Sequence, residues 1–423
     1  MITTDHIEAS MIRRSSIPFL FAAAAAALAC SDADGRSAAA ESWRAERDTV
    51  GDTVIVRTVA GSVWGDTARL VEKLSIGVAD GTEEEMLGDI RAIAVAADGT
   101  VYLSDRSGPA LRQYSPDGRF VGIVGRKGAG PGEYSRPDGG LGVLKDGRVV
   151  IRDPGNGRLA MFTRAGEPAG TWRIGGNLNT SRQLYIDTAG ALYTLAIVDR
   201  ENFGVGLARF APDGTPGDTT AAPKWDYEEA EVIAQTKDNT SISNVPFTPE
   251  PRWTFSPLGY YVGGLSSRYA VDLFRPGAPR LRIERTTPPV PVGAEEGAAR
   301  QREITENMRT IIPGWVWNGP SVPSTKPPFR ELLTSAEGNI WVVLSRPARR
   351  VPAATADGTD EWVEDVAFDV YEPDGRYLGV VRAPDGFRTS PEPVIRGDTV
   401  WAVVEDADGV QFVKRLQLAR GAM

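Results

Sequence analysis

The sequence of 423 residues is poor in the side chains that most often carry catalysis and metal binding. It has one histidine, His6, and one cysteine, Cys30, and both lie in the first thirty residues. The rest of the chain therefore cannot form a zinc site of the His/Cys type, a Ser-His-Asp triad or a Cys-His dyad. Disulfide bonds are excluded too, whatever the redox state of the compartment. Carboxylates, tyrosines and arginines remain for any chemistry.

The chain also lacks an excess of positive charge and long apolar runs. Its formal net charge is -9 and its pI is about 5.0, whereas a nucleic-acid-binding surface needs a basic stripe. We therefore expect no nucleic-acid partner. Beyond the N-terminus, no segment reaches the roughly 20 apolar residues that span a bilayer. Any membrane contact is expected through the N-terminus.

Residues 1–30 have the layout of an export signal. Arg13 and Arg14 precede an apolar run and six alanines, and small residues lead up to Cys30. This end resembles a bacterial lipobox, which implies a lipidated Cys30 that anchors the chain to a bilayer. The alternative is a plain signal peptide cleaved after Ala29. We expect an exported protein that is lipid-anchored at the cell envelope, on the outer membrane or the periplasmic face, or is otherwise periplasmic or secreted.

Two further expectations concern this end of the chain. Met11 is an alternative start to Met1, because acidic residues before it are out of place ahead of an export signal. Residues 31–62 are predicted to be a flexible tether and a lead-in strand, since the first part is rich in Ala, Ser, Asp and Glu and lacks periodicity.

The body of the chain is organised by repetition. One phrase, a turn containing glycine followed by a β-rich strand, occurs six times. Its turn glycines are Gly99, Gly147, Gly190, Gly259, Gly338 and Gly397. A second phrase, in which an aromatic residue ends a strand before a turn rich in Pro, Asp and Gly, is interleaved with it. Two hairpins per repeat make a four-stranded antiparallel meander, which is the blade of a β-propeller.

We therefore predict an all-β, six-bladed β-propeller over residues 63–418, with a short tail at 419–423. The sixth repeat leaves room for only three strands. Residues 68–81 have the layout of an outer strand, so strands from both chain ends are predicted to close the ring. We expect a monomeric ring.

The glycine-rich stretch at 125–134 raises the question of a phosphate-binding loop. Such a loop needs Gly-Lys-Ser/Thr at the start of a helix, but Lys127 is followed by Gly128 and no helical pattern follows. The stretch is instead predicted to cross from one blade to the next, where glycines permit a sharp turn. Together with Asp153, Asn156 and Arg158, it resembles the NHL-type repeat, and the chain is similar to exported bacterial six-bladed propellers of the lipoprotein type.

The spacing of the turn glycines locates insertions. Successive intervals are 48, 43, 69, 79 and 59 residues, whereas a bare blade needs about 40 to 50. We place insertions at 221–251, 286–328 and 346–365, with a short helix in the second. In an up-and-down meander, all three fall on the same face. They either frame a binding site there or plug the channel.

Four arginines recur at the expected starts of inner strands, namely Arg91, Arg182, Arg252 and Arg330. Guanidinium groups that converge at the channel mouth suit a carboxylate or phosphate. The alternative is that they form structural ion pairs with Asp105, Asp138, Asp153 or Asp199. Trp315 and Trp317 are a possible stacking platform for a sugar or peptide, or else a local core.

Three functions remain open. The first is a membrane-tethered extracytoplasmic binding propeller for an anionic glycan, peptide, small molecule or protein. The second is an enzyme without histidine, such as a calcium-dependent lactonase or other hydrolase, or a lyase, which we expect less than a binding protein. The third is a structural component of an envelope complex. Acidic clusters show no recognisable ligand spacing, so we expect no cofactor or metal, although calcium remains an option.

Overall fold

The structure is a computed structural model that describes residues 42–107, 111–175, 179–201, 204–352 and 360–421. The predicted export signal and Cys30 lie outside the described residues. Within the described part of the chain, no helix combines the length and the apolar character that a membrane span requires.

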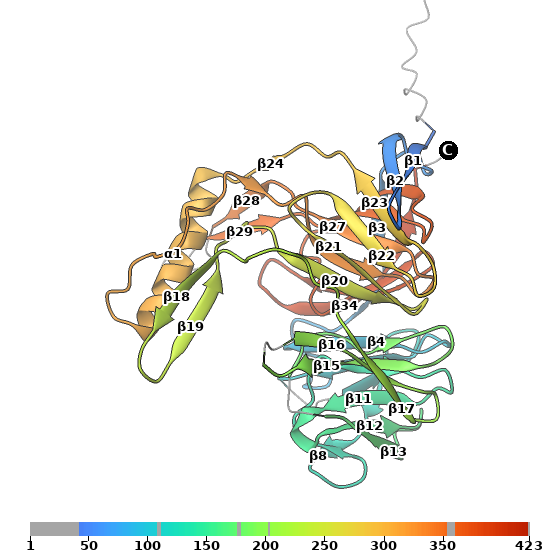
Figure 1. The fold of residues 1–423 in the computed structure, drawn as a ribbon. Coiled ribbons are helices and arrows are strands. Elements are labelled where there is room, and N and C mark those ends of the chain that lie inside the picture. The colour runs from blue at the N-terminus through green and yellow to red at the C-terminus, as the bar shows by residue number, and fades with distance from the viewer. Residues whose placement is uncertain (1–41, 108–110, 176–178, 202–203, 353–359, 422–423) are drawn as a thin grey trace, which may run out of the picture. The chain divides into compact units, whose positions relative to one another are not determined.

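Six four-stranded units are formed in the order of the sequence (Figure 1). Blade 1 contains β4 (Ile90–Val95), β5 (Val101–Asp105), β6 (Leu111–Tyr114) and β7 (Phe120–Ile123). Blade 2 contains β10 (Leu141–Val143), β11 (Val149–Asp153), β12 (Arg158–Phe162) and β13 (Pro168–Arg173), with the 3-10 turn η1 (Pro154–Asn156). Blade 3 contains β14 (Tyr185–Ile186), β15 (Leu192–Asp199), β16 (Gly204–Phe210) and β17 (Pro216–Ala221).

The last three blades complete the propeller. Blade 4 contains β20 (Pro251–Ser256), β21 (Tyr260–Leu265), β22 (Ala270–Phe274) and β23 (Arg280–Arg285). Blade 5 contains β26 (Phe329–Thr334), β27 (Ile340–Leu344), β30 (Ala367–Tyr371) and β31 (Tyr377–Arg382). Blade 6 contains β32 (Val394–Arg396), β33 (Thr399–Glu405), β34 (Gln411–Ala419) and β3 (Ala68–Ile76). The predicted six-bladed propeller of antiparallel blades is confirmed.

The turns that define the repeat have the predicted backbone geometry. All six turn glycines have positive φ, from 51° at Gly397 to 89° at Gly99 and Gly190. Glycine adopts this conformation without the clash that a Cβ atom would cause. The repeat is therefore visible in the sequence because each blade needs glycine at the same place.

Six apolar cores lie between the blades, one between each neighbouring pair. The core between blades 6 and 1 joins Trp401 and Val413 to Ile93 and Leu103. Each sheet is thus buried on both faces, which explains why its strands read as apolar runs rather than as a clean alternation. The last blade packs on the first, so the ring is closed.

Ring closure uses strands from both ends of the chain, as predicted. β3 pairs antiparallel with β34 from Arg69 opposite Ala419 to Ile76 opposite Val413. The first residues of β3 also pair with the end of β31, which joins blades 5 and 6 into one eight-stranded sheet.

The lead-in segment is more regular than the sequence indicated. β1 (Arg44–Val50) and β2 (Thr53–Ala60) form a hairpin, and β2 pairs in parallel with β23. This hairpin extends blade 4 to six strands. Every residue of β1 is exposed, so the strand is held mainly by its ladder with β2, and the sequence has no apolar pattern there that would have predicted it.

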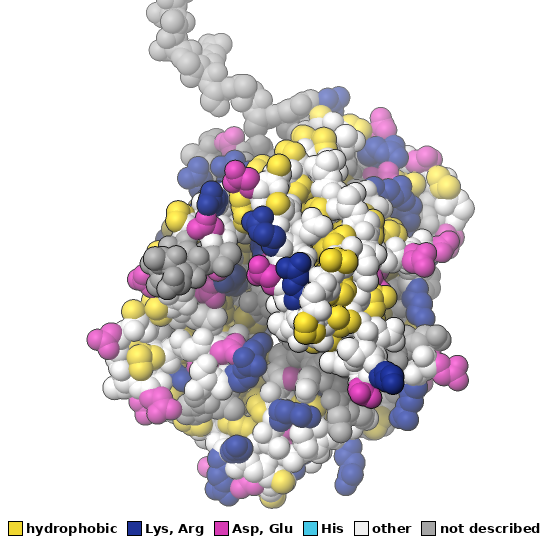
Figure 2. Space-filling view, turned by 90° about the vertical axis from the view of Figure 1, so that its left-hand side faces the viewer, with side chains coloured by type: hydrophobic (Ala, Val, Ile, Leu, Met, Phe, Trp, Pro, Cys, Tyr) yellow, Lys and Arg dark blue, Asp and Glu magenta, His cyan; other side chains and the backbone are white. Residues whose placement is uncertain are grey.

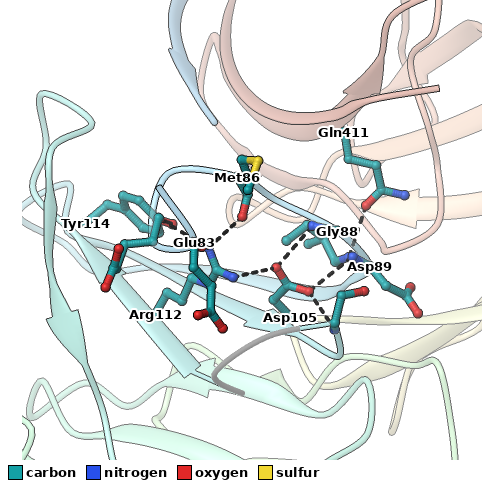
Figure 3. A network of polar contacts seen from close by, with 11 residues as sticks. Glu83, Met86, Gly88, Asp89, Asp105, Arg112, Tyr114 and Gln411 are labelled. Carbon is teal, nitrogen blue, oxygen red and sulfur yellow. Dashed lines mark hydrogen bonds and ion pairs between the residues drawn. The ribbon is translucent and has the colours of Figure 1, made fainter. Parts of the chain in front are cut away.

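Buried charged side chains hold the loops that precede blades 1 and 2, and Figure 3 shows the network of blade 1. In blade 1, Arg112 pairs with Asp105 at 3.2 Å, and Nη1 of Arg112 donates to the carbonyl oxygen of Met86 at 2.8 Å. Asp105 in turn accepts backbone N–H bonds from Gly88 and Asp89. The pair therefore satisfies both the carbonyl and the amide groups of the loop before β4.

Blade 2 repeats this arrangement with the residues that resemble the NHL pattern. Asp153 accepts N–H bonds from Ser135 and Arg136, and Arg158 donates to the carbonyl oxygen of Gly130 at 2.9 Å. The loop itself is braced by the parallel pairing of β8 (Arg126–Lys127) with β9 (Glu133–Tyr134). The glycine-rich stretch is thus a crossing between blades, as predicted.

The three insertions form a cap of two hairpins and one helix, which lie together in Figure 1. Its elements are β18 (Glu231–Gln235), β19 (Thr240–Asn244), β24 (Val290–Pro291), α1 (Ala294–Ile311), β25 (Thr325–Lys326), β28 (Ala348–Val351) and β29 (Glu361–Glu364). A small core of its own, including Val232 and Met308, joins the first hairpin to α1. Figure 2 shows this side of the molecule, where charged side chains of both signs are interspersed with apolar ones.

A buried lysine joins the second and third insertions of the cap. Nζ of Lys326 contacts Glu296 of α1 at 2.6 Å and Glu364 of β29 at 2.7 Å. Glu296 also accepts the backbone N–H of Gly293 at the start of the helix. The cap is therefore a packed unit in which the second insertion contacts both the first and the third.

Two adjacent residues of β3 test the closure of the ring. Leu70 is 5% exposed in the core shared by blades 5 and 6, whereas Val71 is 42% exposed. Leu70→Ala should lower the free energy of unfolding by about 2–5 kcal/mol, because it leaves a cavity in that core. Denaturant unfolding measures this loss. Val71→Ala is the matched control, and equal effects of the two would contradict the closure described.

The buried pair of blade 1 gives a second prediction. Arg112→Met should cost about 3–5 kcal/mol, because Asp105 would remain buried without its counter-ion. The double variant Arg112→Met with Asp105→Asn should recover part of this loss in the same unfolding experiment. Arg119→Ala, at an exposed ion pair, is the control and should leave the midpoint unchanged. A single variant as stable as the wild type would show that the pair does not hold the loop.

Candidate functional site

Three of the four predicted arginines meet at one place at the mouth of the channel. Arg252 is the second residue of β20, Arg330 is the second of β26, and Arg182 lies three residues before β14. These are the innermost strands of blades 4, 5 and 3, and they all begin on the side that carries the insertions. Arg252 and Arg330 thus lie at the starts of inner strands, and Arg182 lies just ahead of one.

The charges of these three arginines all act on the carboxyl of Glu331. Burial raises the pKa of Glu331, while Thr389 and the charges of Arg252, Arg330 and Arg182 act in the opposite direction. The carboxyl of Glu331 therefore lies in the combined positive potential of three guanidinium groups, which come from three blades. Glu331 is therefore the hub of the cluster.

A second carboxyl lies beside it. Glu392, two residues before β32 of blade 6, has its pKa raised to about 8, first by burial and second by the neighbouring Glu331; Arg182 and Gln183 lower it only in part. The two carboxyls differ because three cations act on Glu331 and one on Glu392. With a pKa of about 8, Glu392 holds its proton at neutral pH.

Tyr185 completes the cluster from blade 3. Its hydroxyl accepts a hydrogen bond from Nη1 of Arg182 at 3.3 Å, and burial raises its pKa to about 12. Arg182 also donates to the carbonyl oxygen of Trp253 at 3.0 Å and lies 3.7 Å above the centre of its ring. These contacts fix the guanidinium of Arg182 in one position.

Several polar atoms of this cluster are buried without a partner among the described residues. They are Nε and Nη2 of Arg330, Nε of Arg252, Oε1 of Glu392 and Oγ1 of Thr254. A buried polar group without a hydrogen bond costs free energy that a ligand atom can recover. Donors and an acceptor of this kind, gathered at one mouth, are what a polar ligand would contact.

The ion pairs of Arg252 and Arg330 do not provide hydrogen bonds to these unpaired nitrogens. Arg252 contacts Glu250 at 2.5 Å through Nη2, and Arg330 lies 3.9 Å from Glu364 through Nε. The latter distance is too long for a hydrogen bond. Glu364 is instead engaged by Lys326 of the cap at 2.7 Å, so it connects the cap to the cluster.

Arg91, the fourth predicted arginine, is not drawn into this cluster. Its guanidinium pairs with Asp89 at 2.8 Å, on the loop that leads into β4. The ion pairs expected as the alternative are also different from those found. Asp105 pairs with Arg112, Asp153 with Arg158 and Asp138 with Arg152.

The two tryptophans of the second insertion lie in the cap. Trp315 is 7% exposed in the core that joins β18 to α1, and its indole N–H donates to the carbonyl oxygen of Ile233 at 2.9 Å. Its ring is therefore packing and does not offer a face for stacking. Trp317 is half-buried beside it, with its N–H bonded to Pro320.

The cavity described next does not coincide with the cluster of arginines and carboxyls. One cavity of about 300 Å³ is lined by residues of the β2–β3 connection together with Arg285 and Tyr377. Both polar side chains are already bonded to the buried Asp369, at 2.6 and 2.7 Å. Over the described ranges, no group of three or more Asp, Glu, His or Cys side chains is placed to hold a metal ion.

Glu331 and Glu392 were missed in the sequence. The count back from the turn glycines considered cations alone, yet Glu331 lies seven residues before Gly338 and Glu392 five before Gly397. The same count, applied to acidic residues, would have placed both at the channel mouth. Their proximity to each other and to Tyr185 depends on how blades 3, 5 and 6 pack together. A local sequence pattern does not predict this packing.

Comparison with known proteins supports no closer assignment. No family model and no curated protein matches the sequence. Solved structures that are similar include a member of the DUF4221 family from Bacteroides vulgatus, 8% identical, with a TM-score of 0.49 over 84% of this chain and 99% of the other. A protein from Bacteroides fragilis that is predicted to be exported is 9% identical, with a TM-score of 0.43 over 83% and 94%. Virginiamycin B lyase from Staphylococcus aureus is 10% identical, with a TM-score of 0.37 over 83% and 99%.

The pKa of Glu392 gives a prediction for stability. Because the pKa is raised from 4.5 to about 8, the folded state binds this proton more tightly than the unfolded chain does. Stability should therefore fall as the pH rises from about 4.5 to 8. Glu392→Gln removes this titration, so between pH 5 and pH 9 the variant should gain about 4 kcal/mol relative to the wild type.

Urea unfolding at both pH values measures this gain. The matched control is Glu303→Gln on the exposed face of α1, whose profile should run parallel to that of the wild type. Parallel profiles for Glu392→Gln and the wild type would show that Glu392 is ionised in the folded protein.

Proposed function

We propose that this protein is a membrane-tethered, extracytoplasmic binding propeller that takes an anionic ligand at the channel mouth on the insertion-bearing side. The ligand is a small anion, an acidic glycan or an acidic segment of another protein. The tether is proposed from the sequence, through lipidation of Cys30, and places the ring at the cell envelope. The binding site is proposed from Arg182, Arg252 and Arg330.

One observation carries the proposal, namely the buried guanidinium nitrogens that lack a partner among the residues described. Arg330 has two of them and Arg252 has one, and the two arginines stand on neighbouring inner strands. A guanidinium donates in a planar fork that matches the two oxygens of a carboxylate or phosphate. An anion between these arginines would satisfy donors that the protein itself leaves unpaired.

The surroundings of the arginines support a preformed site. Arg182 is held by Tyr185 and by the ring and carbonyl of Trp253. Glu364 ties the cap to the start of β26 through Lys326 and Arg330. Side chains that are fixed before the ligand arrives lose little entropy on binding.

A second candidate is an acid–base enzyme that uses no histidine. The observation that favours it is the pair of Glu331 and Glu392, whose environments separate their protonation states. Such a pair can supply a base and an acid at one pH. Fold alone does not decide between binding and catalysis.

Ligand-induced stabilisation tests the binding proposal. The purified protein is heated with glucuronate, citrate or inorganic phosphate, and the anion that stabilises it is then titrated by calorimetry. Saturation at 100 times the dissociation constant should add about 2.7 kcal/mol. Arg330→Ala should weaken binding by about 10- to 150-fold, since a charged hydrogen bond contributes about 1.5–3 kcal/mol.

Arg91→Ala is the matched control, because Arg91 occupies the same register on β4 but is not among the cations that act on Glu331 or Glu392. It should bind the anion as the wild type does. If no anion binds and Arg330→Ala only melts at a lower temperature, the arginines are structural and the proposal fails. Chemical conversion of a bound anion, followed by nuclear magnetic resonance, would favour the enzyme instead.

A further inference from the structure

We propose that the ligand of this site is a hydroxy acid, whose carboxylate lies between the arginines and whose hydroxyl group contacts the carboxyl of Glu392. This inference rests on the proposed anion site and deepens it by naming the class of ligand. The observation behind it is that the cluster contains a second, different kind of unpaired atom, the buried Oε1 of Glu392.

The charges around Glu392 determine the role it can take. The groups that act on it are the carboxyl of Glu331, the guanidinium of Arg182 and the amide of Gln183. The hydroxyl of Tyr185, which also feels Glu392, stays protonated because its own pKa is about 12. Thus one cation and one carboxyl face Glu392 directly, and they largely offset each other.

Two other cations of the mouth each have one acidic neighbour and still have unpaired nitrogens. Arg252 lies against Glu250, and Arg330 lies near Glu364. An ionised Glu392 would add a further negative charge to a site that has to accept an anion. Binding an anion therefore favours the protonated form of Glu392, and the folded protein already stabilises that form at neutral pH.

A protonated carboxyl has a hydrogen-bonding requirement that an anion alone does not meet. It presents one O–H donor and one carbonyl-type acceptor. A hydroxyl group can satisfy both, because it accepts from the O–H and donates to the other oxygen. A second carboxylate of the ligand could accept but not donate, and a methyl or methylene group could do neither. A carboxylate with a hydroxyl group nearby, as in a uronic acid, meets both parts of the site.

The experiment compares two anions of equal charge and similar ring size, glucuronate and cyclohexanecarboxylate, by calorimetry on the purified protein. At pH 7 glucuronate should bind at least tenfold more tightly. Between pH 7 and pH 9 its affinity should fall about tenfold as Glu392 loses its proton. Tyr185, with a pKa of about 12, stays protonated throughout that range.

Two variants isolate Glu392. Glu392→Gln keeps a donor and an acceptor but cannot ionise, so it should bind glucuronate within about threefold of the wild type at pH 7 and lose the pH dependence. Glu392→Ala should lose the preference for glucuronate over cyclohexanecarboxylate. Glu303→Gln, on the exposed face of α1, should behave as the wild type.

The outcomes separate the two proposals. If both anions bind equally, or if the wild type and Glu392→Gln show the same pH profile, the hydroxy-acid proposal is wrong while the anion site stands. If neither anion binds, or if Arg330→Ala binds as the wild type does, the proposed function itself is wrong.

Discussion

The constraint on which this structure depends is that every blade is apolar on both faces of its sheet. A blade can bury those faces only against its two neighbours, so six cores must form together and the ring must close. The pairing of β3 with β34 completes the last blade, and buried pairs such as Asp105 with Arg112 hold the loops between blades. The channel mouth is rigid because it is built from the starts of strands whose positions these contacts fix.

Most of this architecture could be read from the sequence because its signals are local. A turn glycine with positive φ, an aromatic residue before a turn and a β-rich strand are properties of a few consecutive residues. The hairpin of β1 and β2 could not be read in this way. Its first strand is exposed throughout, and its second pairs in parallel with β23, more than 200 residues later in the chain. The edge of β23 with which β2 pairs is formed only when blade 4 has folded.

The candidate site was predicted in part, for a related reason. Arginines at the starts of inner strands can be counted from the turn glycines, and Arg182, Arg252 and Arg330 do meet there. The same count could not separate them from Arg91, because the difference is whether the arginine acts on Glu331, which depends on how the blades assemble. The properties of Glu331 and Glu392 arise from burial and from neighbours on several blades. These properties arise only when the blades assemble into the channel mouth, so the sequence of a single repeat does not predict them.

The pairing of β3 with β34 also has a consequence for how the protein is made. The partners of this ladder, such as Arg69 and Ala419, are separated by about 350 residues, so the ring cannot close until nearly the whole chain has been synthesised. At the usual pace of translation this takes roughly 20 to 70 seconds. Throughout that time the apolar face of blade 1 that will meet Trp401 has no cover. The nascent chain therefore needs a holding factor, or a rapid handover to one, to avoid aggregation before its last strand emerges.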